Sequence, residues 1–272
     1  MIEIPEDRGK DIHGLEYPDE AELILFMAGN QFMVMDELLQ AFREEYGIEK
    51  IFYETLPPGL LLKQILEGAK YRDVVLPQIP DVYSSVSEDS MKLLKEKGLI
   101  DDYFVYLHNR IVLMVPKGNP KRIRSIFDLA RDDIVVSHPN PENEDIGKYI
   151  VQMYLEVGGE KLRRKIMEKK AREGTTIYTL VHHRETPERI LKGKADAGWV
   201  WATEAIYARM KGLPVEMVEV EIDMSDRVNY YIAKLKNAPN PENAEAFLEF
   251  IKSEKAQRIY QKYGFVPHFV RE

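Results

Sequence analysis

Hydrophobic positions along the first third of the chain alternate between two periods, which predicts an α/β fold. The run AELILFMAG, residues 21–29, is typical of a buried strand, and FMVMDELLQAFREEYG, residues 32–47, has apolar residues at helical spacing and ends in glycine. Two more strand and helix pairs are expected at residues 48–56, 58–71, 80–86 and 87–100. This order indicates a mostly parallel sheet.

The same alternation restarts near residue 110. Strands are expected at residues 110–120, 133–138, 195–201, 215–222 and 228–235. Helices are expected at residues 123–131, 146–159, 160–173, 186–194 and 240–265. The restart indicates a second α/β region, and the length of 272 residues is sufficient for about two domains.

Composition describes a globular chain and excludes several classes of protein. Hydrophobic residues make up 44% of the chain, and no apolar run approaches the roughly 18 residues that span a membrane. A net charge of −8 argues against a nucleic-acid partner, and the absence of cysteine excludes disulfides and thiolate ligands. The first residues are acidic and polar, so a secretion signal is either absent or removed. Abundant Glu, Lys and Arg without Cys would suit a thermophile.

Both tryptophans lie in the segment ADAGWVWATEA, residues 195–205. In a strand, Trp199 and Trp201 point to the same face, because side chains alternate. The following residues predict a helix with Thr203 as its N-cap. Trp201 is therefore expected where a strand passes into a helix, which is where ligands bind in α/β proteins.

Five segments together resemble a known family. They are the loop GNQF after the first strand, PDVYSSVSEDSMKLLKEKGLI, VLMVPKGNPKRIRSIFDLA, GKADAGWVWATEA and NAPNPENAEAFLEFIKSEKAQRIYQKYGFVP. In this order they resemble the type II periplasmic solute-binding proteins of ABC importers, and most closely the molybdate and tungstate group. The resemblance covers residues 22–267.

The resemblance implies a two-lobed α/β fold, often called a Venus flytrap, in which each lobe has a mixed sheet flanked by helices. Lobe 1 would comprise residues 1–113 plus 227–272, and lobe 2 residues 114–226. A small oxyanion would be captured in the cleft between them and passed to an ABC permease. The chain would then be a periplasmic or extracellular monomer, associated with the membrane through a removed signal or anchor segment, without a cofactor, resident metal or catalytic activity.

Loops at strand ends supply the candidate solute ligands of lobe 1. Hydroxyl and amide groups there would bind an oxyanion, together with helix N-termini. The candidates are Asn30, Gln31, Thr55, Ser84 and Ser85. Asn30 could equally be a helix cap, and the two serines could simply pack in a turn.

The loop HPNPENEDIGKYI carries the first candidates of lobe 2. Asp145, Ile146 and Gly147 would present backbone amides at a helix start. This loop departs from the family pattern, because Glu142, Glu144 and Asp145 are acidic where relatives are neutral. Carboxylates facing the cleft would repel an anion or bind a cation, whereas carboxylates facing solvent would stabilise the helix N-terminus.

The segment VHHRETP adds further candidates. His183 and Arg184 could donate hydrogen bonds to an oxyanion, as could the indole N–H of Trp201. Alternatively, His182 or His183 could join Glu144 or Asp145 in a metal site, or Arg184 could form an ordinary surface salt bridge. Paired tryptophan rings could also stack on an organic solute.

Catalytic motifs are not found in the sequence. It has no nucleophile elbow, Walker or dinucleotide glycine pattern, and no His-Glu-x-x-His spacing. The alternatives that stay open are a binding protein for a metal ion or organic solute, a sensory ligand-binding domain, and an enzyme on the same fold.

Overall fold

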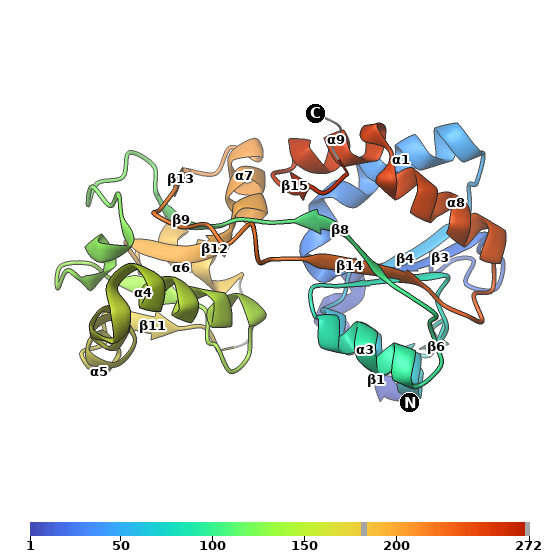
Figure 1. Ribbon diagram of the computed structural model, residues 1–272, viewed down its shortest axis with the longest axis horizontal. Coiled ribbons are helices and arrows are strands. Elements are labelled where there is room, and N and C mark those ends of the chain that lie inside the picture. The colour runs from blue at the N-terminus through green and yellow to red at the C-terminus, as the bar shows by residue number, and fades with distance from the viewer. Residues whose placement is uncertain (181–183, 270–272) are drawn as a thin grey trace. The chain divides into compact units, whose positions relative to one another are not determined.

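The computed structural model describes residues 1–180 and 184–269 (Figure 1). The chain forms two compact α/β units, unit 1 from Met1–His108 with Asn229–Glu272, and unit 2 from Asn109–Val228. Among the described helices, none combines the length and the apolar composition that a membrane span requires.

Unit 1 is built on a seven-stranded mixed sheet in the order β15-β8-β14-β7-β3-β4-β2. Its strands are β2 (Ile12–His13), β3 (Leu23–Phe26), β4 (Ile51–Glu54), β7 (Val82–Ser85), β8 (Phe104–His108), β14 (Tyr230–Lys234) and β15 (Val266–Pro267). β4, β3 and β7 run parallel, whereas β14 pairs antiparallel with both β7 and β8. The parallel arrangement expected for β3, β4 and β7 is therefore confirmed, whereas β14, β8, β15 and β2 complete the sheet in the antiparallel direction, so the sheet as a whole is mixed.

Helices cover both faces of this sheet. They are α1 (Met35–Tyr46), α2 (Pro58–Glu67), α3 (Glu88–Glu96), α8 (Pro241–Lys252) and α9 (Glu254–Lys262), preceded by the short 3-10 helix η2 (Gly29–Val34). Phe42 of α1 packs against Phe247 and Phe250 of α8, with ring centroids 5.4 Å apart in both pairs. Leu61, Ile65, Met91 and Leu94 of α2 and α3 join Phe26 and Phe52 in the core of the other face. Figure 1 shows α3 on the face away from α1 and α8.

Turns end two of these helices at glycines. Gly47 adopts a left-handed φ of 67° after α1, as the sequence predicts. Gly68, with φ of 75°, ends α2 earlier than expected, and Ala69–Tyr71 forms strand β5 instead of a helical turn.

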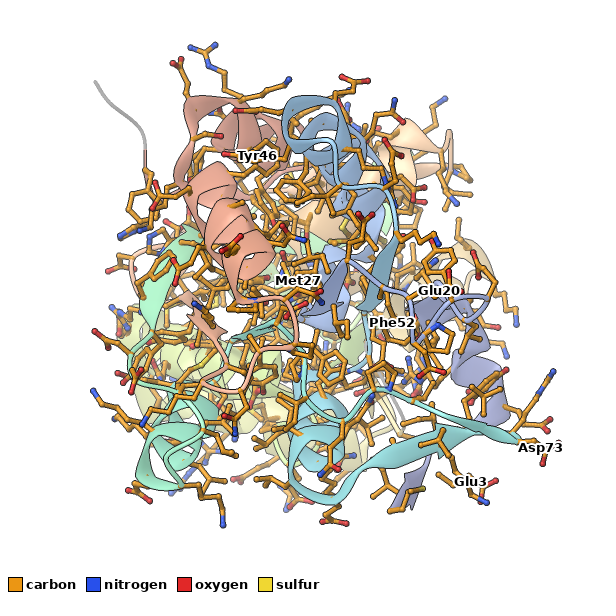
Figure 2. The ribbon with its side chains drawn as sticks, turned by 90° about the vertical axis from the view of Figure 1, so that its right-hand side faces the viewer. Glu3, Glu20, Met27, Tyr46, Phe52 and Asp73 are labelled. Atoms are coloured by element: carbon orange, nitrogen blue, oxygen red, sulfur yellow. The ribbon has the colours of Figure 1, made fainter. Side chains whose placement is uncertain are left out.

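The first residues of the chain are ordered against unit 1. They form β1 (Ile2–Glu3), the 3-10 helix η1 (Glu6–Asp11) and β2. β1 pairs with β5, which pairs in turn with β6 (Val74–Val75), giving a separate three-stranded sheet. In Figure 2, Asp73 marks the tip of the β5–β6 hairpin and Glu3 lies beside it, away from Met27 and Phe52 in the interior.

Unit 2 contains a five-stranded mixed sheet in the order β11-β10-β12-β9-β13. Its strands are β9 (Ile111–Pro116), β10 (Val136–His138), β11 (Thr176–Tyr178), β12 (Ala197–Trp201) and β13 (Val215–Val218). α6 (Glu185–Leu191) and α7 (Ala202–Met210) pack on one face, α6 through Ile190 and α7 through small residues including Ala205 and Ala208. α4 (Asp145–Arg164) packs against β12 through Tyr154, whose ring lies 6.0 Å from that of Trp199.

α4 continues into a π-helical turn, η4 (Lys165–Lys169), and α5 (Lys170–Arg172). Gly159 breaks the regular backbone of α4 with φ 69° and ψ −169°, at the boundary where two helices were expected. Lys170 is fully buried, and its ammonium group donates hydrogen bonds to the carbonyl oxygens of Arg131 and Ile134. This contact ties α5 to the loop before β10.

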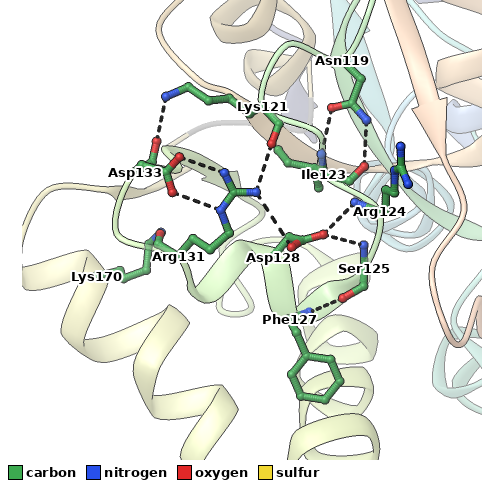
Figure 3. A network of polar contacts seen from close by, with 10 residues as sticks. All are labelled: Asn119, Lys121, Ile123, Arg124, Ser125, Phe127, Asp128, Arg131, Asp133 and Lys170. Atoms are coloured by element: carbon green, nitrogen blue, oxygen red, sulfur yellow. Dashed lines mark hydrogen bonds and ion pairs between the residues drawn. The ribbon is translucent and has the colours of Figure 1, made fainter.

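The helix expected at residues 123–131 is shorter and is a 3-10 helix, η3 (Ile126–Ala130). Ser125 caps it by accepting a hydrogen bond from Phe127 N, while Asp128 accepts one from Ser125 N. In Figure 3, Arg131 extends this network to Asp133, with which it makes hydrogen bonds of 3.0 and 2.8 Å. This capping box starts the helix at Ile126, and the extended backbone of Arg131 ends it after Ala130.

Candidate functional site

Three loops of unit 1 meet at the carboxyl edge of its parallel strands. The N–H of Ala28, after β3, donates a hydrogen bond of 3.2 Å to Ser84 Oγ on β7. Gly29 lies against the loop after β4, where a Cβ atom would be 2.8 Å from the Thr55 carbonyl oxygen. A Cβ atom at this position would clash with the Thr55 carbonyl, so glycine at position 29 allows the first two loops to approach this closely.

Two polar side chains in these loops, Asn30 and Thr55, each have a buried oxygen atom that makes no hydrogen bond within the described residues. Asn30 Nδ2 donates to Tyr230 OH over 2.7 Å. Asn30 Oδ1 and Thr55 Oγ1 are buried and have no hydrogen-bond partner among the residues that the structure describes. Buried polar atoms normally have a hydrogen-bond partner. Two such atoms without a partner, in loops that are in contact, therefore indicate a place for a polar ligand.

Gln31, Ser84 and Ser85 are engaged within the unit. Gln31 is fully buried; its Nε2 donates to Tyr106 OH over 2.7 Å and to Ser84 Oγ over 3.0 Å. Tyr260 OH donates to Gln31 Oε1 over 2.9 Å. Ser85 Oγ accepts a hydrogen bond of 3.0 Å from Ser87 N. These contacts hold the loop after β3 in place from inside.

Glu54 is the acidic residue next to Thr55, and it is fully buried. Gln64 Nε2 donates to its Oε1 over 3.0 Å, and burial raises the pKa of the carboxyl group to about 8. Glu54 is therefore predominantly protonated at neutral pH. The Glu54 carboxyl group, although adjacent to Thr55 in the chain, thus adds little negative charge to this edge of the sheet.

In unit 2, the loop before α4 folds over the first turn of that helix. A Cβ atom on Gly147 would lie 2.7 Å from Cα of Pro141, and Gly147 N donates to Glu144 O over 3.0 Å. Ile146 is buried. The Asp145 carboxylate is half exposed and 3.4 Å from Lys148 Nζ. The Glu144 carboxylate accepts a hydrogen bond from Thr179 Oγ1.

The segment before α6 is described only in part. His182 and His183 lie outside the described residues, whereas Arg184 occupies the position before the first residue of α6. Arg189 of the same helix was not singled out from the sequence. Its guanidinium donates to Ser137 Oγ and to the carbonyls of Ile177 and Tyr178, and so supports the carboxyl ends of β10 and β11. The sequence does not reveal this role, because a charged residue such as Arg189 within a helix normally faces solvent.

Both tryptophans are buried at the end of β12. Trp199 has no exposed surface, and its Nε1 donates to Tyr154 OH over 2.7 Å. Trp201 is 5% exposed and lies edge-on to Tyr149, with centroids 6.4 Å apart. Trp201 itself precedes the first helical residue of α7, so the prediction of Thr203 as N-cap is wrong. Thr203 is instead inside the helix, where its Oγ1 accepts a hydrogen bond from Asn109.

His138, at the end of β10, is a polar residue that sequence reasoning missed. It is fully buried between Tyr154 and Tyr178, with ring centroids 5.7 and 5.3 Å away. Its Nδ1 is 2.8 Å from Pro139 O, and burial lowers the pKa of the imidazole to about 4. The ring is therefore neutral at physiological pH, and its Nε2 has no hydrogen-bond partner in the described part of the chain. A lone histidine ending a short strand does not reveal this burial.

Clusters of three or more His, Asp or Glu side chains suited to a metal ion are not found among residues 1–180 and 184–269. Together, the two mixed α/β units and their polar strand ends are typical of proteins that bind a small solute. The chain belongs to the family of bacterial extracellular solute-binding proteins, whose family pattern it matches over residues 23–266.

Among individual relatives, the chain is 27% identical over 210 residues to YvgL of Bacillus subtilis, named as an ABC transporter substrate-binding lipoprotein; the match covers 76% of this chain and 72% of YvgL. It is 25% identical over 214 residues to the molybdate-binding protein ModA of Mycobacterium tuberculosis, covering 76% of this chain and 74% of ModA.

Solved structures share the fold. The periplasmic molybdate-binding protein of Azotobacter vinelandii matches with a TM-score of 0.68 at 20% identity, over 90% of this chain and 99% of its own. The sulfate-binding protein SubI of Mycobacterium tuberculosis matches with a TM-score of 0.71 at 19% identity, over 90% and 85% of the two chains. These matches establish the type of fold, which is that of the two-lobed periplasmic binding proteins.

Proposed function

We propose that this protein captures a small oxyanion of the molybdate or tungstate type and delivers it to an ABC permease without chemical change. The family match, the names of two relatives and the resemblance of the five sequence segments support this function. The same reasons support a monomer that acts outside the cytoplasmic membrane, held there by a signal or anchor segment.

The observation that carries the proposal is the meeting of the three loops at the carboxyl edge of β4, β3 and β7. Hydrogen-bonding groups of Asn30 and Thr55 are buried there, and the adjacent Glu54 carboxyl is mainly neutral at physiological pH. An oxyanion is best bound by hydroxyl, amide and backbone N–H donors with no ionised carboxylate beside them. Thr55 would donate a hydrogen bond from its hydroxyl group to the solute. Asn30 would donate one from Nδ2 once its amide rotates by half a turn, so that Oδ1 accepts a hydrogen bond from Tyr230 OH in place of the present contact.

In unit 2, we propose that Arg184, His183, Trp201 and the start of α4 at Asp145, Ile146 and Gly147 contribute the remaining contacts. The chain passes between the units at residues 108–109 and 228–229. Hinge bending near these positions, close to the boundaries expected from the sequence, would enclose the solute as the resemblance implies. If charged His183 binds the anion, affinity falls as pH rises through the imidazole pKa, about 6.5 when unperturbed.

Calorimetry with molybdate, tungstate, sulfate and phosphate, beside zinc, nickel and ferric ions, tests the function. We expect an oxyanion to bind with micromolar or lower Kd. Tight metal binding that is abolished by Glu144→Ala with Asp145→Ala, together with no oxyanion binding, would establish the metal-ion alternative instead.

Two matched variants locate the site. Thr55→Val removes one donor to a charged ligand, which is worth about 1.5–3 kcal/mol, so affinity should fall by roughly tenfold or more. Thr176→Val is the control, because Thr176 Oγ1 is also buried without a partner among the described residues but lies at the start of β11 in unit 2. Equal affinity of both variants for the oxyanion would contradict a site at Thr55.

A further inference from the structure

Two tyrosines hold consecutive residues of the loop after β3. Asn30 Nδ2 donates a hydrogen bond of 2.7 Å to Tyr230 OH. The next residue, Gln31, donates one of 2.7 Å from Nε2 to Tyr106 OH. Tyr106 lies on β8, Tyr230 is the first residue of β14, and both side chains are fully buried. Two neighbouring strands therefore hold the candidate loop through adjacent residues.

The pairing of β8 with β14 is irregular at these tyrosines. Tyr230 lies opposite Leu107, whereas Tyr231 lies opposite Val105. Tyr106 is therefore the extra residue of a β-bulge. Bulges redirect the side chains beside them and are frequent next to active sites. Here the bulge lies where the two tyrosine hydroxyl groups reach the loop that contains Asn30.

Both strands are also next to the places where the chain passes between the units. β8 ends at His108, the last residue of unit 1 before unit 2 begins. The chain returns to unit 1 at Asn229, one residue before Tyr230. The ring of Tyr230 packs edge-on against Phe265 and Tyr106, with centroids 5.6 and 6.4 Å apart. Tyr230 is therefore fixed by its neighbours, and bending of the chain at Asn229 would begin beside it.

The hydrogen bond between Asn30 and Tyr230 can be made in two ways. A side-chain amide has a donor nitrogen and an acceptor oxygen of similar size, and a phenol hydroxyl can accept or donate. In the structure Asn30 donates, and its Oδ1 is buried without a partner among the described residues. If the amide rotates by half a turn, Tyr230 donates to Oδ1, and Nδ2 takes the former position of Oδ1. Only this second arrangement offers an N–H to an oxyanion at that position.

We propose that Tyr230 is a positioning residue that couples oxyanion binding at Asn30 to the strand that returns from unit 2. The oxyanion stabilises the arrangement in which Tyr230 donates, so binding changes a hydrogen bond at the first residue of β14. Coupling of this kind is reciprocal, so a movement of β14 that improves this hydrogen bond also strengthens oxyanion binding. The proposal rests on the proposed function, because it deepens the role of that same site.

Calorimetry with molybdate tests the positioning role. Tyr230→Phe keeps the packed ring but removes the partner of the Asn30 amide, so affinity should fall roughly tenfold. The same change in an Asn30→Ala background should have no further effect, because the interaction that it removes is already lost. Equal losses in the two backgrounds would mean that Tyr230 acts only through packing, and that result would overturn the proposal.

Tyr71→Phe is the matched control. Tyr71 is also a buried tyrosine of unit 1, and its hydroxyl donates to Glu6 O over 3.2 Å. Its removal should lower the thermal stability but leave the molybdate affinity unchanged. A loss of affinity as large as that of Tyr230→Phe would indicate a general effect of destabilising unit 1, and would overturn the proposal.

Hydrogen exchange of the backbone amides at residues 229–232 tests the coupling without any change at Tyr230. Saturating molybdate should slow this exchange in the wild type, and slow it less in Asn30→Ala. Equal slowing in the two proteins would overturn the coupling. Failure of the wild type to bind any of the four oxyanions would refute the proposed function itself, whereas wild-type binding with unaltered affinity in Tyr230→Phe would refute only the role of Tyr230.

Discussion

Tyr260 donates a hydrogen bond of 2.9 Å to Gln31, and this contact joins the last helix of unit 1 to the loop after its first parallel strand. Both side chains are fully buried. Through Nε2, the same Gln31 amide reaches Tyr106 on β8 and Ser84 on β7. The candidate loop is therefore positioned by residues from three distant parts of the chain.

Replacing Tyr260 with Phe should destabilise unit 1. Gln31 Oε1 would lose its donor in a buried site, which costs about 1–3 kcal/mol. Urea denaturation measures this difference. Tyr103→Phe is the control, since the Tyr103 hydroxyl donates to the partly exposed Glu88 and its loss should cost well under about 1 kcal/mol. Equal losses in the two variants would contradict a structural role for the buried network.

Glu54 should make stability fall as pH rises. Its pKa is raised from 4.5 to about 8 by burial, so between these values the folded state binds a proton that the unfolded state has lost. The free energy of unfolding should therefore decrease by up to about 1.4 kcal/mol per pH unit from this group. Glu54→Gln should lack this slope and be more stable than the wild type near pH 8, by denaturation at several pH values. Parallel pH profiles for the two proteins would show that Glu54 is ionised in the folded state.

His138 should act in the opposite direction and in a more acidic range. Burial lowers its pKa from 6.5 to about 4, so the unfolded state binds the additional proton between these values. Stability from this group is fully present above pH 6.5 and is lost as pH falls toward 4. In His138→Phe, the free energy of unfolding should decrease less steeply as pH falls, by the slope that one bound proton contributes. Denaturant titrations between pH 4 and 7 measure this slope. An unchanged slope would mean that the imidazole is accessible and charged at low pH.

Gly147→Ala should destabilise unit 2 although alanine favours helices. Its Cβ atom would lie 2.7 Å from backbone atoms of Pro141, and such overpacking costs typically about 1–3 kcal/mol. Gly59→Ala, in the first turn of α2, has no atom within 4 Å of the added Cβ and should be neutral or slightly stabilising. Calorimetric melting compares the two. A Gly147→Ala protein as stable as the wild type would show that the loop can move off the helix.

Sequence periodicity predicted the elements that have one apolar face. It failed for segments whose structure is determined by contacts with distant parts of the chain. The strand of Leu23–Phe26 and the helix of Met35–Tyr46 follow the hydrophobic pattern and are confirmed. Strand β8, Phe104–His108, was missed because its pairing with β14 depends on residues more than a hundred positions away. The first 22 residues were read as a polar start, although Ile4 and Ile12 anchor them in the core.

The same distinction applies to the candidate site. The order of strand and loop located Asn30, Thr55 and Ser84 at one edge of the sheet, because carboxyl ends of parallel strands coincide. It could not show that both the nitrogen and the oxygen of the Gln31 amide are bonded inside the unit, or that the N–H of Thr55 is bonded to the carbonyl oxygen of Asp11. Those relationships depend on how helices and strands pack, which local spacing does not encode.

The position of β14 between β7 and β8 has a consequence for biosynthesis. Unit 2 is continuous in the chain, whereas the strand Tyr230–Lys234 that completes the sheet of unit 1 is translated only after all of unit 2. Until then, β7 has an edge whose backbone groups lack their final partner, and such edges promote aggregation. We therefore expect nascent chains that end before residue 229 to need a chaperone that prevents aggregation. Chains that include residues 229–272 should no longer need it.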